Sequence, residues 1–189
     1  MGRGHLFIIS GPSGAGKGTV VQGLLARRPE LKLAVSTTTR SPRPTERHGV
    51  HYNFLSSQDF QRMRERGEFL EWAEVHGNLY ATPKRFVREN VSLGNDVLLE
   101  IDVQGAREVK RNLPDACLIF IEAPSYTELE RRLRRRSTER SEEMGRRMAA
   151  AYDEMRSRGW FDGVVVNETV GQTVEEVLKL MDQIKERDP

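Results

Sequence analysis

The chain has 189 residues, of which 37% are hydrophobic and 31% charged, with 16 glycines and 8 prolines. These proportions exclude collagen-like, low-complexity and disordered chains, and the length suits one domain with a small insertion and a buried core. Lysine and arginine total 30 against 28 acidic residues, a net charge of +2. No overall charge therefore draws the chain to nucleic acid or to an anionic membrane.

Short, nearly continuous apolar runs alternate with longer helical patterns along the chain. The runs cover residues 6–9, 33–35, 97–101, 118–121 and 164–166, and the helical patterns cover 18–28, 103–112, 126–136, 141–158 and 173–186. Ser125 with Glu128, and Thr173 with Glu176, have the spacing of a capping box at a helix start. Continuous apolar runs are typical of strands buried on both faces, so the alternation predicts an α/β fold with a parallel sheet of about five strands flanked by helices.

Residues 40–82 interrupt this alternation. Pro42 and Pro44 exclude a helix at the start of the segment, and residues 51–55 have the composition of a strand. Residues 68–75 mix polar and apolar positions, which predicts an exposed strand, and Gly77-Asn78 predicts a turn after it. We therefore expect a small mixed β insertion between the second and third strands of the main sheet.

A glycine-rich loop follows the first apolar run and precedes the first helix. It matches the first seven positions of the phosphate-binding pattern G-x-x-x-x-G-K-[ST] and consists of Gly11, Pro12, Ser13, Gly14, Ala15, Gly16 and Lys17. Its backbone N–H groups and the following helix N-terminus favour an anion, and Lys17 adds a full positive charge. Gly18, followed by Thr19, replaces the hydroxyl residue that would ligate magnesium, so we expect Mg²⁺ to be held mainly by nucleotide oxygens and waters.

Together with further blocks, this loop resembles the guanylate kinase family over about residues 5–186. The blocks are Ser36-Thr37-Thr38-Thr39-Arg40-Ser41-Pro42-Arg43, His51-Tyr52-Asn53-Phe54, Phe69-Leu70-Glu71-Trp72-Ala73 and Leu99-Glu100-Ile101-Asp102-Val103-Gln104-Gly105. The resemblance implies a P-loop NTPase-type core at 1–39, 83–136 and 143–189, a small mixed α/β GMP-binding insertion at 40–82 and a short lid at 137–142. It also implies transfer of the γ-phosphoryl group of ATP to GMP, or to dGMP, with Mg²⁺.

The resemblance also implies residue roles on the GMP side. Glu71 reads the two donors on one edge of guanine, which adenine lacks, while Ser36 and Thr82 contact the base. The phosphate of GMP is bound by two arginines three residues apart and by two tyrosine hydroxyls, from Arg40, Arg43, Tyr52 and Tyr80. Glu100 and Asp102 lie where the third core strand ends, and their separate roles stay open. Leu79 and Ala81 are small departures from the family pattern.

The densest run of charge, residues 131–140, carries the arginines of the lid. Arg132 and Arg136 are four residues apart on one helix face, and the resemblance implies that they and Arg147 surround the transferring phosphoryl group. Ser137 stands where the family usually has glycine. Asn167 matches the adenine end of the ATP site. We expect the remaining arginines of the run to lie on the surface.

A binding module, a kinase for another acceptor and a nucleic-acid-binding protein fit these residues less well than a guanylate kinase. A guanylate-kinase-like binding module would lack the loop lysine, which is present, and a related kinase for phosphorylated ribose would not need Glu71 and Ser36. Nucleic-acid binding through 131–140 lacks interleaved aromatic residues. The four histidines have no metal-ligand spacing, and the single cysteine, Cys117, lies in an apolar run. Because run 6–9 is too short for a signal or membrane segment, we expect a soluble, cytoplasmic enzyme without a nucleic-acid or membrane partner; its oligomeric state is not predicted.

Overall fold

The computed structural model describes residues 2–75, 77–136 and 141–187, with the side chains of 136 and 141–144 outside this description. The chain divides into two compact units. The first unit contains residues 1–6, 30–99 and 104–116, and the second contains 7–29, 100–103 and 117–189. In the described part of the chain, no helix has both the length and the apolar character needed to cross a membrane.

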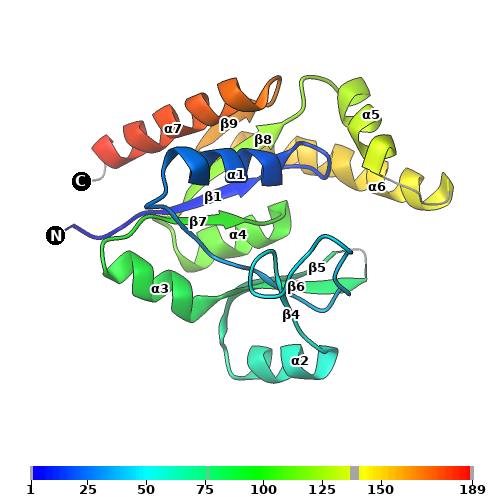
Figure 1. Cartoon of the computed structure of the whole chain (residues 1–189). Coiled ribbons are helices and arrows are strands. Elements are labelled where there is room, and N and C mark those ends of the chain that lie inside the picture. The colour runs from blue at the N-terminus through cyan, green and yellow to red at the C-terminus, as the bar shows by residue number, and fades with distance from the viewer. Residues whose placement is uncertain (1, 76, 137–140, 188–189) are drawn as a thin grey trace. The chain divides into compact units, whose positions relative to one another are not determined.

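The second unit is built on parallel strands with helices packed against them. Its elements are β1 (Leu6–Ser10), α1 (Lys17–Arg27), β8 (Cys117–Glu122), α5 (Tyr126–Arg136), α6 (Ser141–Arg156), the short 3-10 helix η1 (Ser157–Trp160), β9 (Gly163–Val166) and α7 (Val170–Arg187). Strand β8 pairs in parallel with both β1 and β9. Helices α1 and α7 lie side by side (Figure 1), and ion pairs from Arg27 to Glu175 and from Arg28 to Asp182 join them.

The first unit contains a second, smaller sheet. The elements of this unit are β2 (Lys32–Leu33), β3 (Thr37–Thr38), β4 (Asn53–Phe54), α2 (Ser57–Glu65), β5 (Phe69–Val75), β6 (Asn78–Pro83), α3 (Lys84–Ser92), β7 (Val97–Glu100) and α4 (Val103–Asn112). Strands β4, β3, β6 and β5 form a four-stranded sheet in that order, with β3–β4 parallel and the other pairs antiparallel. The sheet is therefore mixed, as the sequence predicts.

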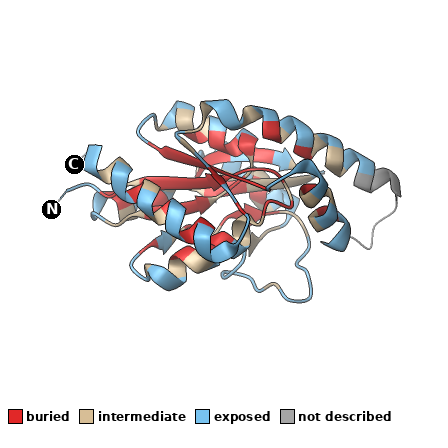
Figure 2. Ribbon diagram, turned by 90° about the horizontal axis from the view of Figure 1, so that it is seen from above, coloured by how far each residue is buried: buried red, intermediate tan, exposed pale blue. Residues whose placement is uncertain are grey.

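The five apolar runs of the sequence become one sheet in the order β2-β7-β1-β8-β9. Backbone bonds from Val97 to His5 and from Ile101 to Ile9 join β7 to β1, and β8 pairs with the other side of β1. All five residues of β1 and all six of β8 are buried, which is the reason for their unbroken apolar character. The predicted α/β fold is thus confirmed, and Figure 2 shows the buried residues concentrated in these strands.

Two helices of the first unit have no counterpart in the sequence prediction. Helix α2 begins after Ser56, whose hydroxyl accepts a hydrogen bond from the backbone N–H of Asp59, and it buries only Phe60. Helix α3 follows Pro83, whose fixed φ favours a helix start. Both helices are nine residues long, so each carries only a few apolar positions and gives a weak periodic signal.

The last helix starts earlier than predicted. Helix α7 begins at Val170, and Thr169 is its capping residue, since its hydroxyl oxygen accepts from the backbone N–H of Gln172 at 3.4 Å. The prediction that Thr173 caps this helix is wrong. Thr173 lies one turn inside it, where its hydroxyl donates to the Thr169 carbonyl. The periodic apolar pattern starts later than the helix because the first turn is exposed.

Strand β5 is present where the sequence predicts it, but the prediction that it is exposed is wrong. Glu71 and Ala73 are buried on one face, Trp72 and Glu74 are exposed on the other, and Phe69 and Leu70 before the bulge are buried as well. A β-bulge between Phe69 and Glu71 makes Glu71 the register partner of Thr82. Glu71, a polar residue of this alternating segment, therefore carries its carboxylate on the buried face.

We expect Gly11→Ala to destabilise the protein by about 3 kcal/mol, because this glycine has a φ of +136° and a side chain there would lie 2.1 Å from the carbonyl oxygen of Ile121. Gly18→Ala is the matched control. Its Cβ would meet nothing closer than the Glu100 carboxylate at 3.5 Å, so we expect a gain of ~0.5–1 kcal/mol from helix propensity. Urea unfolding of both variants measures the difference, and equal free energies of unfolding would contradict the close approach.

Candidate functional site

The glycine-rich loop in the second unit joins β1 to α1. Gly16 has a φ of +94° and forms the N-cap of α1 in the left-handed conformation. A side chain at this position would lie 2.4 Å from the Asn167 amide nitrogen, so only glycine allows that amide to approach the loop. Helix α1 has no acidic residue in its first turn, which leaves its positive N-terminal end to an anion.

The Lys17 ammonium lies folded back over this loop. Its Nζ donates to the carbonyl oxygens of Gly11 at 2.6 Å and Pro12 at 3.1 Å. The loop thus places a full positive charge beside its own backbone N–H groups, which is the arrangement that binds the terminal phosphates of a nucleotide.

Asn167 connects the end of β9 to the loop. It is buried, its amide nitrogen donates to the Ala15 carbonyl at 2.7 Å, and its amide oxygen accepts from the Thr173 hydroxyl at 3.1 Å. Its side chain is therefore engaged with the phosphate loop.

Arg132 reaches the same carbonyl from α5. Its guanidinium donates to Ala15 at 3.3 Å and to the Asn167 carbonyl at 3.0 Å, and its Nε donates to Glu128 at 2.7 Å. Ser125 caps the helix as predicted, but the Glu128 carboxylate binds Arg131 and Arg132. Hydrogen bonds from these two arginines hold the pKa of Glu128 at about 2. This ion pair fixes the Arg132 guanidinium beside the loop.

A pocket of about 480 Å³ opens beside the loop, within the range of small-ligand sites. Gly14, Gly16, Thr19, Arg132 and Asn167, all predicted site residues, line it. Arg131 and Arg135 are exposed on the surface, as predicted, and they also line this pocket. Both lie within a turn of Arg132 on α5, and that spacing is the signal that could have indicated them.

Arg147, the third arginine predicted for the site, lies on α6, and so does a carboxylate that was not predicted. Glu154, seven residues later on the same helix face, accepts a hydrogen bond from the backbone N–H of Ser13 at 3.2 Å. Burial raises the pKa of Glu154, and the nearby Asp102 carboxylate raises it further against the charge of Lys17. The Glu100 carboxylate lies near Gly18. Two carboxylates, of Glu100 and Glu154, therefore lie close to the loop and the first turn of α1.

Arg136 is the last residue of α5, and its side chain lies outside the described residues. Positions 137–140 of the predicted lid, Ser137 included, also lie outside them.

In the first unit, β5, β6 and the residue before β3 bring together the predicted base-reading side chains. The Thr82 hydroxyl donates to Glu71 Oε1 at 2.6 Å, and both residues are buried. Ser36 is also buried. Thr37, the residue after Ser36, is the register partner of Ala81, the residue before Thr82.

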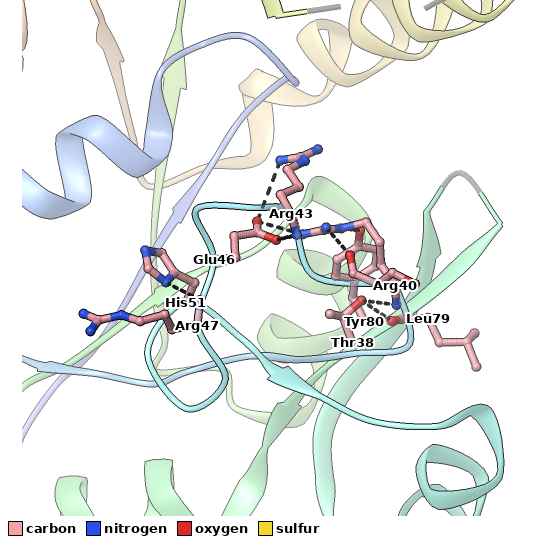
Figure 3. A network of polar contacts seen from close by, with 9 residues as sticks. Thr38, Arg40, Arg43, Glu46, Arg47, His51, Leu79 and Tyr80 are labelled. Atoms are coloured by element: carbon pink, nitrogen blue, oxygen red, sulfur yellow. Dashed lines mark hydrogen bonds and ion pairs between the residues drawn. The ribbon is translucent and has the colours of Figure 1, made fainter.

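The predicted phosphate-binding residues of this unit meet around Arg40. Arg40 Nε donates to the Tyr80 hydroxyl at 3.2 Å (Figure 3). Its guanidinium carbon lies 5.5 Å from the centre of the Tyr52 ring. The Tyr52 and Tyr80 rings are 6.0 Å apart and nearly perpendicular. Arg43 is more exposed, with 69% of its side-chain surface accessible, and therefore remains open to a ligand from solvent.

Glu46 is the centre of this network and was not predicted. Its carboxylate accepts two hydrogen bonds from Arg40, at 2.9 and 3.0 Å, and one from the backbone N–H of Arg43 at 2.8 Å. Partial burial alone would raise the pKa of Glu46, but these bonds and the two positive charges outweigh it and lower the pKa. A single glutamate in a loop has no sequence pattern that marks it. The residues around it form an anion-binding cradle that already holds a carboxylate.

A glycine-rich loop between a buried parallel strand and a helix, with a lysine and an arginine beside it, defines a P-loop phosphotransferase. A family model described as guanylate kinase matches residues 3–184. This chain belongs to the guanylate kinase family and is a kinase of the ATP:GMP phosphotransferase class.

Individual relatives agree with this assignment. The guanylate kinase of Aromatoleum aromaticum is 49% identical to the chain, and the match covers 94% of this chain and 87% of the relative. The guanylate kinase of Rubrobacter xylanophilus is 48% identical, and the match covers 97% of this chain and 96% of the relative. The solved guanylate kinase of Anaplasma phagocytophilum has a TM-score of 0.82 at 31% identity, covering 97% of this chain and 87% of that one. A sugar kinase of Janibacter, 15% identical over 95% of both chains with a TM-score of 0.52, shares the fold alone.

We expect Glu46→Gln to lower the free energy of unfolding at neutral pH. The lowered pKa of Glu46 means that its ionised form stabilises the native state above the usual value of 4.5, and that this contribution disappears as the pH falls through the native pKa. Urea unfolding from pH 7 to pH 3 should therefore show the variant and the wild type converging in acid. A constant difference would contradict the role of the charge.

We expect Glu154→Gln to change stability with the opposite sign. A raised native pKa means that ionising Glu154 costs stability as the pH rises above the usual value of 4.5. The neutral amide removes this cost and can still accept the Ser13 N–H, so the variant should be more stable at neutral pH and approach the wild type in acid. The same unfolding series measures it, and lower stability at pH 7 would refute the prediction.

Proposed function

We propose that this protein transfers the γ-phosphoryl group of ATP to GMP, giving ADP and GDP, and that it accepts dGMP as well. Family membership supports the reaction class, and the single observation that carries the choice of acceptor is the buried Glu71 carboxylate bound to Thr82. Guanine offers N1–H and its amino group on one edge, and a carboxylate accepts from both. Adenine lacks this donor pair, and a buried carboxylate left unpaired costs about 1–3 kcal/mol or more.

The acceptor phosphate belongs in the cradle around Arg40. A phosphate dianion accepts the kind of hydrogen bonds that the Glu46 carboxylate accepts from Arg40 and from the Arg43 backbone. The exposed Arg43 guanidinium and the hydroxyls of Tyr52 and Tyr80 supply the further donors. In this proposal Glu46 keeps Arg40 oriented between catalytic cycles.

The donor nucleotide belongs at the phosphate loop. Residues 11–19 hold the phosphates, the pocket beside Asn167 takes the nucleoside, and Lys17 with Arg132, Arg136 and Arg147 neutralises charge on the moving group. Phosphoryl transfer needs alignment and charge stabilisation more than a covalent nucleophile, and we assign none.

The magnesium ion of the reaction fits these residues through water. Gly18 provides no ligand, and the Glu100 carboxylate close to it, with Asp102, can bind the ion's water shell. When bound, Mg²⁺ offsets charge between the phosphates. The division into core, insertion and lid remains a proposal, with residues 137–142 closing over the phosphates to exclude water. We further propose that the enzyme acts in the cytoplasm on these small molecules, without nucleic acid or membrane.

We expect Glu71→Gln to reduce kcat/KM for GMP by about 100-fold, because an amide presents a donor to one of the two guanine donors and ~3 kcal/mol is lost. Glu74→Gln, on the exposed face of the same strand, is the matched control and should be unchanged. A coupled assay of ADP release from Mg-ATP, with GMP, dGMP, AMP or no acceptor, measures both variants.

The wild type should turn over with GMP and dGMP and not with AMP. If GMP gives no turnover while ATP binds normally, GMP is not the acceptor and the protein is a P-loop kinase for another substrate. If neither ATP nor GMP binds, the protein is not this enzyme, and the binding-module alternative is favoured.

A further inference from the structure

A second pocket, of about 360 Å³, lies in the first unit, and the proposed reaction does not use it. We propose that it binds a small molecule carrying a polyphosphate group. The pocket is lined by Arg64 of α2, Trp72 of β5, Lys84 and Arg88 of α3, and Glu108 and Asn112 of α4. Its volume is within the range of small-ligand sites, and three of these six side chains are cations.

The three cations differ from their neighbours in having no acidic partner. On the same two helices, Arg62 pairs with Asp59 and Arg85 pairs with Glu89, and Arg66 just after α2 pairs with Glu68. Within residues 2–75, 77–136 and 141–187, no ion pair is formed by Arg64, Lys84 or Arg88. Intrachain carboxylates therefore neutralise the cations around the pocket and leave those that line it available to a ligand.

The acidic and amide groups of the pocket are already engaged. The Glu108 carboxylate accepts a hydrogen bond from the backbone N–H of Trp72 at 3.2 Å, and the Asn112 amide donates to the Leu70 carbonyl at 3.1 Å. These bonds fasten α4 to β5 and form one wall. Three cations against one carboxylate leave a net positive pocket.

Arg64 is held in place by an aromatic ring. Its guanidinium carbon lies 4.4 Å from the centre of the Trp72 ring, a cation–π contact that lowers the entropy lost when this side chain binds a ligand. The planar guanidinium groups of Arg64 and Arg88 suit bidentate contact with phosphate oxygens, and Lys84 adds a point charge. Cations from two different helices are better matched by several linked phosphates than by one monoanion.

This pocket is separate from the guanine-reading residues. Glu71 faces the buried side of β5 toward Thr82, whereas Trp72, the next residue, lies on the exposed face. Neighbouring residues of a strand point to opposite faces, so a ligand against Trp72 does not occupy the position of the base.

Tryptophan fluorescence tests the proposal, because Trp72 is one of only two tryptophans and the other, Trp160, lies in the second unit. A Trp160→Phe protein is titrated with sodium tripolyphosphate and, separately, with CTP, each with and without saturating ADP and GMP. We expect a saturable change that persists with ADP and GMP present. Tighter binding of CTP than of tripolyphosphate identifies a nucleotide ester, and the reverse identifies the free polyphosphate.

The deciding comparison is between two double variants of equal charge. Lys84→Gln with Arg88→Gln removes two lining cations, and we expect at least about tenfold weaker binding. Arg62→Gln with Arg85→Gln removes two paired cations from the same helices and should leave the affinity unchanged. The proposal would be overturned if both double variants bound the ligand equally weakly or if the fluorescence of Trp72 showed no saturable change. It would also be overturned if saturating ADP and GMP abolished the fluorescence change. Since the readout is binding at Trp72, failure of the GMP kinase assay would leave this result unaffected.

Discussion

The carbonyl oxygen of Ala15 is the point at which the phosphate loop is tied to the rest of its unit. It accepts from the Asn167 amide and from the Arg132 guanidinium, which come from positions 152 and 117 residues away in the chain. The amide can reach it only because position 16 has no side chain. One backbone oxygen thus sets the position of the loop against β9 and α5, and the pocket beside it depends on that alignment.

Carboxylates occupy the anion-binding groups of both units. In the first unit Glu46 lies against Arg40 and the Arg43 backbone, and in the second Glu154 accepts from the loop N–H of Ser13. Their pKa values move in opposite directions because hydrogen bonds and charges from two arginines outweigh burial at Glu46, whereas burial and a nearby carboxylate outweigh the charge of Lys17 at Glu154. A protein that binds highly charged ligands has to hold its cations in place between ligands, and internal carboxylates do this without filling the site permanently.

The sequence predicted the features that have strong local patterns. Continuous apolar runs identified the five core strands, and the loop from Gly11 to Lys17 identified the phosphate site. Contacts made by single residues in loops and on helices had no such pattern, and Glu46 and Glu154 were missed for that reason. Thr173 had the right residue type and spacing for a cap, but Thr169 one turn earlier forms it. Tertiary packing also decided the burial of strand β5, which the mixed pattern predicts to be exposed, and the bulge pairs its Glu71 with Thr82.

That bulge has a consequence for how this strand can change in evolution. Phe69 packs in an aromatic cluster with Phe60, and two positions later Glu71 is paired with Thr82, while β6 advances by only one residue over the same interval. Deleting Leu70 would let the two strands advance equally, so Phe69 could still pair with Pro83 and Glu71 with Thr82, each on its present face. A deletion between Glu71 and Val75, where the pairing is regular, would instead turn the residues beyond it to the opposite face. The length of this strand is therefore constrained more tightly after Glu71 than between Phe69 and Glu71.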